Sequence, residues 1–279
     1  MIGVIDEAIN QVIDDNSPPD SRQIETLNRH LEELRIATDV VTAGLKEGDD
    51  ALTAKRDAML KSLKQGAVHF SKRRFNSHSE DSWPTFEITA SPLAISADSD
   101  PYKVAASCGL AGDFDRFIYC RALRELSHLV MRGRMERVIF RQSATLLKEP
   151  EHLDVIKTGL RQCQIVGTGL IIEFDLPSLA TNLKRARSVI EALAELDIGV
   201  AIGKFVYNKT AYKILKYLKA DAIRPHRSLL CADEDKVRHL AQRVQSRQVE
   251  IILPRVARRE QIALHWLELA DYFQADFAD

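Results

Sequence analysis

The first 65 residues carry apolar side chains at helical spacing and contain no strand-like run. After a break at residues 16–21, one stretch repeats apolar positions every three or four residues, over about three heptads. These positions are Ile24, Leu27, Leu31, Leu34, Thr38, Val41 and Leu45. A further helix is expected at about 51–63. The seam suits both a helical bundle packed on its own domain and a dimer interface, and its spacing does not distinguish them.

From about residue 67, short apolar runs of strand type alternate with amphipathic helical stretches. The runs fall at 137–140, 164–173, 198–202, 221–223 and 249–253. One helical stretch opens at Pro177 and keeps a single apolar stripe as far as Leu196. Successive runs begin roughly 20 to 35 residues apart, which is the repeat of a βα unit. We therefore predict an α/β fold with a parallel sheet, either doubly wound or closed as a barrel, and about 210 residues suit a compact barrel.

The charge balance excludes two classes of protein. Lys and Arg total 39 and Asp and Glu total 40, a net charge of −1 in 279 residues. This balance excludes a generally basic nucleic-acid-binding protein and an acidic disordered chain. The basic clusters at 72–74, 224–227 and 255–259 are expected to be solvated surface, so nucleic acid is not an expected partner.

The common signals for membranes and for ligand chemistry are missing. No apolar run approaches the ~18 residues of a membrane helix, and the N-terminus lacks a basic leader. Gly167 and Gly169 form a GxG without the third glycine of a dinucleotide fingerprint, inside an expected strand. No P-loop, HExxH or zinc-ligand spacing occurs, so we expect no metal and no cofactor. The four cysteines form no CxxC pair and are expected to be reduced, mostly buried thiols of a cytosolic protein.

Several segments match one known family in the same order along the chain. Residues 113–118, Asp-Phe-Asp-Arg-Phe-Ile, resemble the Asp-Arg-Trp helix entry of that family. Residues 170–176 resemble its Glu-Leu-Thr-Glu strand, 198–205 the strand ending in Asp-Asp-Phe-Gly, 220–225 the Ile-Lys-Ile-Asp strand, and 271–275 the closing Asp-Tyr-Val-Gln-Gly. From about residue 67 onward, the chain resembles the EAL domain, the barrel phosphodiesterase family that cleaves cyclic di-GMP.

The resemblance implies that some pocket residues are kept and others replaced. Glu87 matches the glutamate of the Glu-Ala-Leu motif, Glu173 keeps the first carboxylate of Glu-Leu-Thr-Glu, and Gln274 matches the glutamine of the closing motif. Four replacements fall at positions of metal ligands or catalytic groups in the family. Arg141 stands for an asparagine, Gly203 and Lys204 for the two aspartates, and Arg224 for the catalytic lysine.

These replacements remove the ligands that metal-assisted phosphodiester cleavage requires. Such cleavage uses two divalent cations about 4 Å apart, held by several carboxylate and amide oxygens. Glu87 and Glu173 remain, whereas Arg141 and Lys204 bring positive charge to ligand positions. Our hypothesis is that the two glutamates form internal salt bridges with Arg141 or Lys204. We therefore predict no catalytic residues, no metal site and a vestigial pocket.

The sequence as a whole predicts a helical segment, residues 1–65, followed by a degenerate EAL-type (β/α)8-like barrel, residues 66–279. The expected function is that of a catalytically inactive regulatory or scaffold protein, not an enzyme. It would bind an unidentified protein partner or form a homodimer through the N-terminal helices, in the bacterial cytoplasm that the family implies. The alternative is a receptor that binds cyclic di-GMP without hydrolysing it. The pattern is least regular between Ser71 and Asp100, where the first barrel strands are expected.

Overall fold

The computed structural model describes residues 49–77, 79, 82–93, 95–96, 99–149, 151–255 and 262–274. The seam from Ile24 to Leu45 lies outside these ranges, as does most of the expected N-terminal segment 1–65. Its role in dimerisation or partner binding therefore stays a prediction, and so does the domain boundary after residue 65.

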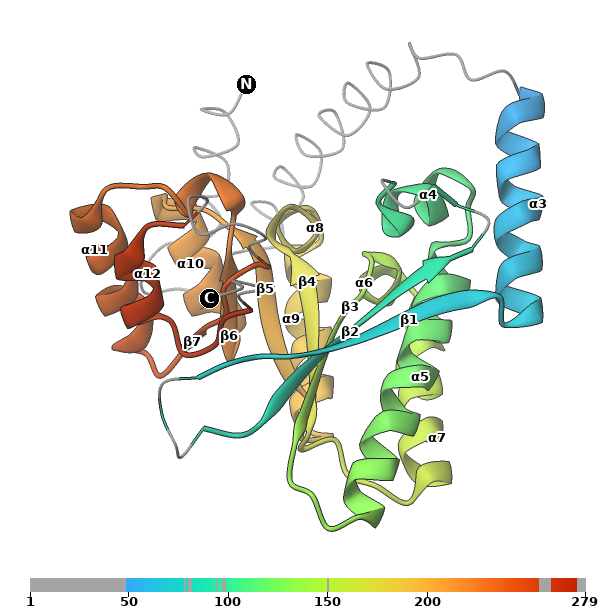
Figure 1. Ribbon diagram of the computed structural model, residues 1–279, viewed down its shortest axis with the longest axis horizontal. Helices are drawn as coiled ribbons and strands as arrows, with labels where there is room; N and C mark the ends of the chain where they lie inside the picture. Colours follow the sequence, from blue (N-terminus) through green and yellow to red (C-terminus); the bar gives the residue numbers. More distant parts are fainter. Residues whose placement is uncertain are drawn as a thin grey trace, which may run out of the picture.

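A seven-stranded sheet forms the centre of the fold (Figure 1). Its strands are β1 (Val68–Arg74), β2 (Thr85–Pro92), β3 (Arg137–Arg141), β4 (Leu170–Asp175), β5 (Gly199–Phe205), β6 (Ala222–Pro225) and β7 (Glu250–Ile251). The strands lie in sequence order, β1 pairs antiparallel with β2, and every later pair is parallel. This confirms the predicted α/β fold with a mostly parallel sheet.

Two isolated bridges join the ends of the sheet. Ile252, directly after β7, pairs in parallel with Tyr272, and Phe273 pairs antiparallel with Asn76 beyond the end of β1. The backbone groups of Asn76 and Phe273 exchange two hydrogen bonds of 2.8 and 3.0 Å. The segment 272–273 therefore closes the sheet into a ring between β7 and β1.

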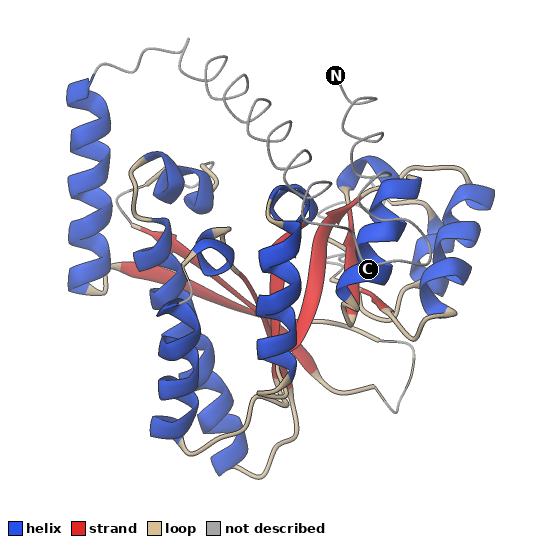
Figure 2. Ribbon diagram, turned by 180° about the vertical axis from the view of Figure 1, so that it is seen from behind, coloured by secondary structure: helices blue, strands red, loops and turns tan. Residues whose placement is uncertain are grey.

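Helices cover the outside of the strands on several sides (Figure 2). They are α3 (Asp49–Gln65), α4 (Pro101–Ser107), α5 (Ala111–Met131), α6 (Thr145–Lys148), α7 (Glu151–Cys163), α8 (Leu176–Thr181), α9 (Leu183–Ala194), α10 (Lys209–Leu218), the short 3-10 helix η1 (Arg227–Leu229), α11 (Glu234–Gln245) and α12 (Leu264–Leu269). Local capping explains several starts: Asp100, Asn208 and Asp233 each accept a hydrogen bond from a backbone amide of the helix that follows.

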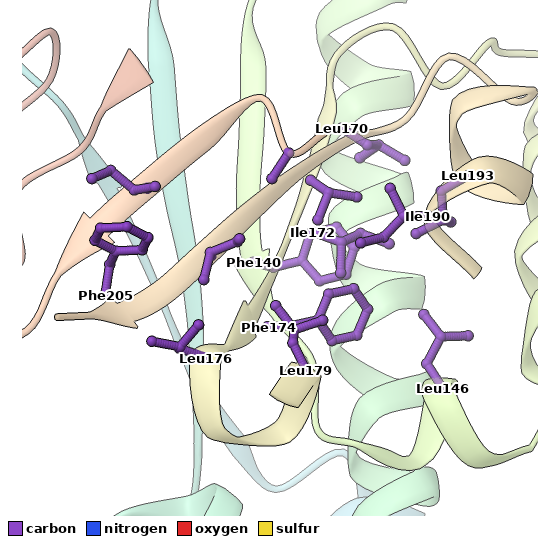
Figure 3. Close-up of a cluster of buried hydrophobic side chains, with 14 of the residues drawn as sticks. Phe140, Leu146, Leu170, Ile172, Phe174, Leu176, Leu179, Ile190, Leu193 and Phe205 are labelled. Atoms are coloured by element: carbon purple, nitrogen blue, oxygen red, sulfur yellow. The ribbon is translucent and has the colours of Figure 1, made fainter. Parts of the chain in front are cut away.

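The strand side chains alternate between a helix-facing core and the barrel interior. In the helix-facing core, Phe140, Ile172 and Phe174 pack with residues of α8 and α9 (Figure 3). The interior holds a separate apolar cluster made of Phe75, Ile139, Ile171, Ala201, Ala222, Ile252 and Tyr272. Because inward positions recur every second residue, the charged residues two positions further along each strand also point inward.

The strand predictions hold for β3, β5, β6 and β7, each of which overlaps an expected run. The helix expected at 51–63 is also present, as α3. The uncertain region between Ser71 and Asp100 contains two intact strands, β1 and β2, paired over seven residues. The expected strand at 164–173 was wrong in its first half, because the ordered strand begins only at Leu170.

The long helix expected from Pro177 to Leu196 is divided at Asn182. The Asn182 side chain donates a hydrogen bond of 2.9 Å to the Ser178 carbonyl, and its backbone has φ −127°. The chain turns there so that α8 covers the end of β4 and α9 runs back along the sheet.

The prediction that the cysteines are mostly buried was wrong. All four cysteines are free thiols, but only Cys108 is buried, whereas Cys120 and Cys231 are exposed. Within the described part of the chain, no helix combines the length and apolar character needed to cross a membrane.

Gly167 and Gly169 lie in the turn before β4 and serve close packing rather than dinucleotide binding. A Cβ on Gly167 would collide with the carbonyl oxygen of Leu196, and one on Gly169 would collide with the Leu126 side chain. We predict that Gly167→Ala lowers the free energy of unfolding by about 1–3 kcal/mol, measured by urea denaturation. Thr168→Ala, at the exposed position between them, is the matched control, and an equal effect of both variants would contradict this packing role.

Candidate functional site

The centre of the candidate site is an arginine held between two glutamates inside the barrel. Glu87 lies on β2, Glu173 on β4 and Arg224 on β6. Arg224 Nη1 lies 2.8 Å from Glu87 Oε1, and Arg224 Nε lies 2.7 Å from Glu173 Oε2. The side chains are 11%, 15% and 9% exposed for Arg224, Glu87 and Glu173. The three groups therefore neutralise one another where little water reaches them.

Burial and pairing have opposing effects on these groups. Burial raises the pKa of the Glu173 carboxyl, and the positive charge of Arg224 opposes this rise. Burial alone lowers the pKa of the Arg224 guanidinium, but the carboxylates of Glu173 and Glu87 raise it by more. Arg224 is therefore charged at every accessible pH, and it supplies the positive counter-charge next to both buried glutamates.

A second cluster of charges lies beyond the first, at the carboxyl ends of the strands. Asp175 Oδ2 accepts hydrogen bonds from Arg141 Nη2 at 2.6 Å and from Lys204 Nζ at 2.5 Å. Arg141 also lies 3.6 Å from Asp100 and 4.6 Å above the ring of Tyr102. We call the residues of these two clusters, Glu87, Asp100, Arg141, Glu173, Asp175, Lys204 and Arg224, the interior charge network.

The hypothesis that Glu87 and Glu173 form salt bridges with Arg141 or Lys204 was wrong. Glu87 and Glu173 pair with Arg224, whereas Arg141 and Lys204 pair with Asp175. The reason is the stagger of the strands, which brings Arg224 of β6 level with Glu173 of β4. Sequence reasoning missed Asp175. The available signal was its spacing: Asp175 comes two residues after Glu173 on the same strand, and residues two apart on a strand point to the same side, here the barrel interior.

Gly203 and Lys204 shape the network through the backbone of β5. A Cβ on Gly203 would collide with the Glu173 carboxylate, so only glycine leaves room for that side chain. Lys204 has φ 53°, and the strand register shifts between Ile202 and Phe205. This irregularity turns Lys204 toward the rim, where its side chain is 43% exposed and reaches Asp175.

Gln274 follows the bridge that closes the ring. It is buried, and neither its amide nitrogen nor its carbonyl oxygen has a hydrogen-bond partner within the described part of the chain. Tyr272, two residues earlier, belongs to the interior apolar cluster, so Gln274 lies on the same, inward side of the segment. No ion pair or hydrogen bond joins it to the interior charge network among the described residues.

The opposite end of the barrel is filled by a separate ion pair. Arg137 on β3 contacts Glu250 on β7 through both terminal nitrogens, at 3.1 and 3.0 Å, and its guanidinium lies 4.9 Å from the centre of the Tyr272 ring. Arg137 Nε also donates to Thr85 Oγ1 at 3.2 Å. The interior therefore has charged layers at both ends and an apolar layer between them.

The network does not fit a divalent metal centre. Arg224 fills the space between Glu87 and Glu173, and the Asp175 carboxylate is occupied by two further cations. A guanidinium has no acceptor atom and repels a metal ion. In the part of the chain that the structure describes, no group of three or more His, Cys, Asp or Glu side chains is arranged to hold a metal.

Asp115, near the start of α5, holds the loop that follows β3 through hydrogen bonds to Ser143. Its carboxylate accepts hydrogen bonds from the Ser143 backbone at 3.0 Å and from the Ser143 hydroxyl at 2.5 Å. The residue is fully buried, and this burial raises the pKa of Asp115 to about 7 against the opposing effect of the Ser143 hydrogen bonds. Asp115 therefore fixes the loop that follows β3, and with it the position of Arg141.

Comparison with known proteins points to one family. A profile of the EAL domain family matches residues 94–278. The FimX EAL domain from Pseudomonas aeruginosa, bound to c-di-GMP, superposes with a TM-score of 0.69 at 19% identity, covering 82% of this chain and 94% of the FimX chain. The Xanthomonas citri FimX EAL domain in complex with c-diGMP gives a TM-score of 0.71 at 16% identity, with coverages of 82% and 93%.

The PaMucR phosphodiesterase, in a c-di-GMP complex, gives a TM-score of 0.68 at 15% identity and covers 80% of this chain and 94% of its own. At 15% to 19% sequence identity, the structural similarity to these domains establishes the fold alone. No curated protein matches the chain by sequence.

We predict that Arg224→Met destabilises the protein strongly, because it leaves Glu87 and Glu173 without their buried counter-charge. The expected loss is about 3–5 kcal/mol in the free energy of unfolding, measured by urea denaturation at pH 7. The loss should shrink as the pH falls, because protonation of Glu173, whose pKa burial raises, removes its unpaired buried charge. Arg238→Met, which removes an exposed pair with Glu234, is the control and should change stability little. Equal stability of the two variants would contradict the role assigned to Arg224.

Asp115 predicts a specific pH dependence of stability. Because its folded pKa lies above the ordinary value of 3.8, the folded state holds this proton up to about pH 7 and the unfolded state does not. The contribution is therefore present at low pH and lost as the pH rises toward 7. Between pH 5 and pH 8, the wild type should lose about 2–3 kcal/mol relative to Asp115→Asn. Parallel pH profiles of the two proteins, measured by denaturant unfolding, would exclude this titration.

Proposed function

Because the chain belongs to the EAL domain family, we propose that it is a catalytically inactive member, acting as a regulatory or scaffold protein through protein–protein interaction. It does not hydrolyse cyclic di-GMP in this proposal. The observation that carries it is the Arg224 guanidinium, placed 2.8 Å from Glu87 and 2.7 Å from Glu173.

The charge of the site supports the absence of hydrolysis. Divalent cations in such a pocket need about six oxygen ligands each, mostly from carboxylates and waters. Here Arg141, Lys204 and Arg224 contribute three positive charges in the same volume as Glu87, Glu173 and Asp175. A metal ion would have to displace these cations from close ion pairs, and the Arg224 guanidinium would then be buried without a partner.

A surface outside the barrel mouth supports the protein-binding part of the proposal. Val130, Met131 and Met135, at the end of α5 and in the turn after it, are 52%, 72% and 71% exposed. Large apolar side chains that gather on a surface are typical of sites that bind another protein. The sequence predicts a second apolar surface of this kind at the seam from Ile24 to Leu45.

A non-hydrolysing cyclic di-GMP receptor is the second candidate. The observation in its favour is the exposed rim lysine, Lys204, together with Arg141 beside it. Both cations could exchange Asp175 for a phosphate oxygen. The two FimX domains with this fold were solved with that dinucleotide bound.

Titration and turnover measurements distinguish the two functions. We predict no cleavage of cyclic di-GMP by the purified protein with magnesium or manganese, and no binding heat in calorimetry up to high ligand concentration. Cleavage that depends on the metal would overturn the inactive assignment altogether. Heat at micromolar affinity without cleavage would establish the receptor instead.

A pair of variants shows whether any heat comes from the rim. Lys204→Met should abolish binding at the barrel mouth, because it removes the exposed cation. Lys61→Met, at an exposed position of α3 outside the barrel, is the matched control. Equal heats from both variants would place the ligand elsewhere on the protein.

A further inference from the structure

The helices α5 and α7 lie side by side on the outside of the barrel, and a groove runs between them (Figures 1 and 2). The Tyr119 hydroxyl of α5 donates a hydrogen bond of 2.8 Å to the Ile156 carbonyl of α7. One turn later on both helices, the Leu123 side chain lies over Gly159, where a Cβ would come within 2.5 Å of Leu123 Cδ1. The two helices therefore run in the same direction and approach closely.

The groove is hollow because the side chains along it are small. Its volume is about 580 Å³, and its lining includes Cys120 and Ser127 of α5 and Thr158 and Cys163 of α7. All four residues are at least partly exposed, so the hollow opens to solvent. Met131, which also lines the groove, is 72% exposed. An open and partly apolar groove between two helices is a typical docking site for another protein.

Charged groups divide this groove into a positive and a negative half. Arg124 and His128 lie one turn apart on α5, toward the C-terminal ends of the two helices. Asp154 lies in the first turn of α7, at the opposite end of the groove. All three residues are exposed, and among the described residues none of them has an ion-pair or hydrogen-bond partner. Their charges are therefore available to another molecule.

A two-fold axis makes this charge pattern complementary to itself. In a symmetric dimer, the same face of both copies is in contact. An axis perpendicular to the helices packs the two helix pairs antiparallel, as in a four-helix bundle, and brings the positive half of each groove opposite the negative half of the other. An acidic partner helix would match Arg124 and His128 but would place like charge against Asp154. The charge pattern therefore favours a second copy of the chain as the occupant.

We propose that the groove between α5 and α7 is a self-association surface, occupied by the same two helices of a second copy of the chain. Arg124 and His128 of each copy face Asp154 of the other copy, and the contact covers Cys120 and Cys163. The inference goes beyond the proposed function, since it holds whether the barrel binds another protein, a dinucleotide or neither.

Sedimentation velocity of the full chain over a range of concentrations tests this surface. We expect a dimer in the wild type. One variant carries Asp154→Lys, and a second variant carries Arg124→Asp together with His128→Asp. Each should raise the dissociation constant of the dimer at least about tenfold, because like charges then face each other. An equimolar mixture of the two variants should restore the dimer, because each reversed half then meets a complementary one.

Two charge reversals outside the groove provide the controls. Lys61→Asp on α3 and Glu195→Lys after α9 change exposed residues and should leave the dimer unchanged. A wild type that stays monomeric at every concentration would overturn the proposal. A dimer that neither groove variant weakens would also overturn it and assign the association to another surface. Failure of the mixture to restore the dimer would overturn the two-fold arrangement.

Thiol reactivity provides an independent readout of the same contact. Cys120 is exposed in the single chain and covered in the proposed dimer, whereas Cys231 is exposed and lies outside the groove. We expect the rate constant for alkylation of Cys120 by iodoacetamide to fall at least about fivefold at concentrations where the dimer forms, with no change at Cys231. Equal rate constants for Cys120 in the dilute and the concentrated protein would contradict the proposal.

Discussion

The bridge from Arg224 to Glu87 and Glu173 is the interaction on which the barrel mouth depends. The three residues come from β6, β2 and β4, alternate strands of the ring, so they form one layer of the interior. Both carboxylates are largely buried, and Arg224 supplies the positive charge that pairs with them. The position of Arg224 therefore decides the charge state of the layer and what else can enter it.

The same ion pairs occupy the carboxylate oxygens that a divalent metal ion would need as ligands. A carboxylate layer in this place with a lysine in the position of Arg224 would leave oxygen lone pairs for a cation. The fork of the guanidinium instead takes one oxygen of each glutamate, and the rim cations Arg141 and Lys204 take Asp175. Buried ion pairs of this kind contribute little net stability, because the cost of desolvating the charges offsets their attraction. The ion pairs occupy the oxygen atoms that a metal ion would need, and this is the physical basis of the proposal that the barrel does not hydrolyse cyclic di-GMP.

The layers of side chains beneath the interior charge network explain how the fold accommodates so many charges at the barrel mouth. An apolar layer that includes Ile139, Ile171 and Tyr272 separates the network from the Arg137–Glu250 pair at the other end. The helix-facing core around Phe140 and Phe174 is independent of both. Changes at the mouth therefore alter charge without disturbing the hydrophobic contacts that hold helices to strands.

The sequence by itself determined the element types, the alternation of inward and outward residues and the replacement of family ligands at Arg141, Lys204 and Arg224. These follow from local periodicity and from residues at known motif positions. Only the tertiary structure decided the ion pairs: Arg224 pairs with both glutamates, and Asp175 pairs with Arg141 and Lys204. The reason is that the stagger of the strands sets which inward-facing residues lie in the same layer. It also decided the turn before β4 and the division of the helix at Asn182. There the contacts with Leu196 and with the end of the sheet override local propensity.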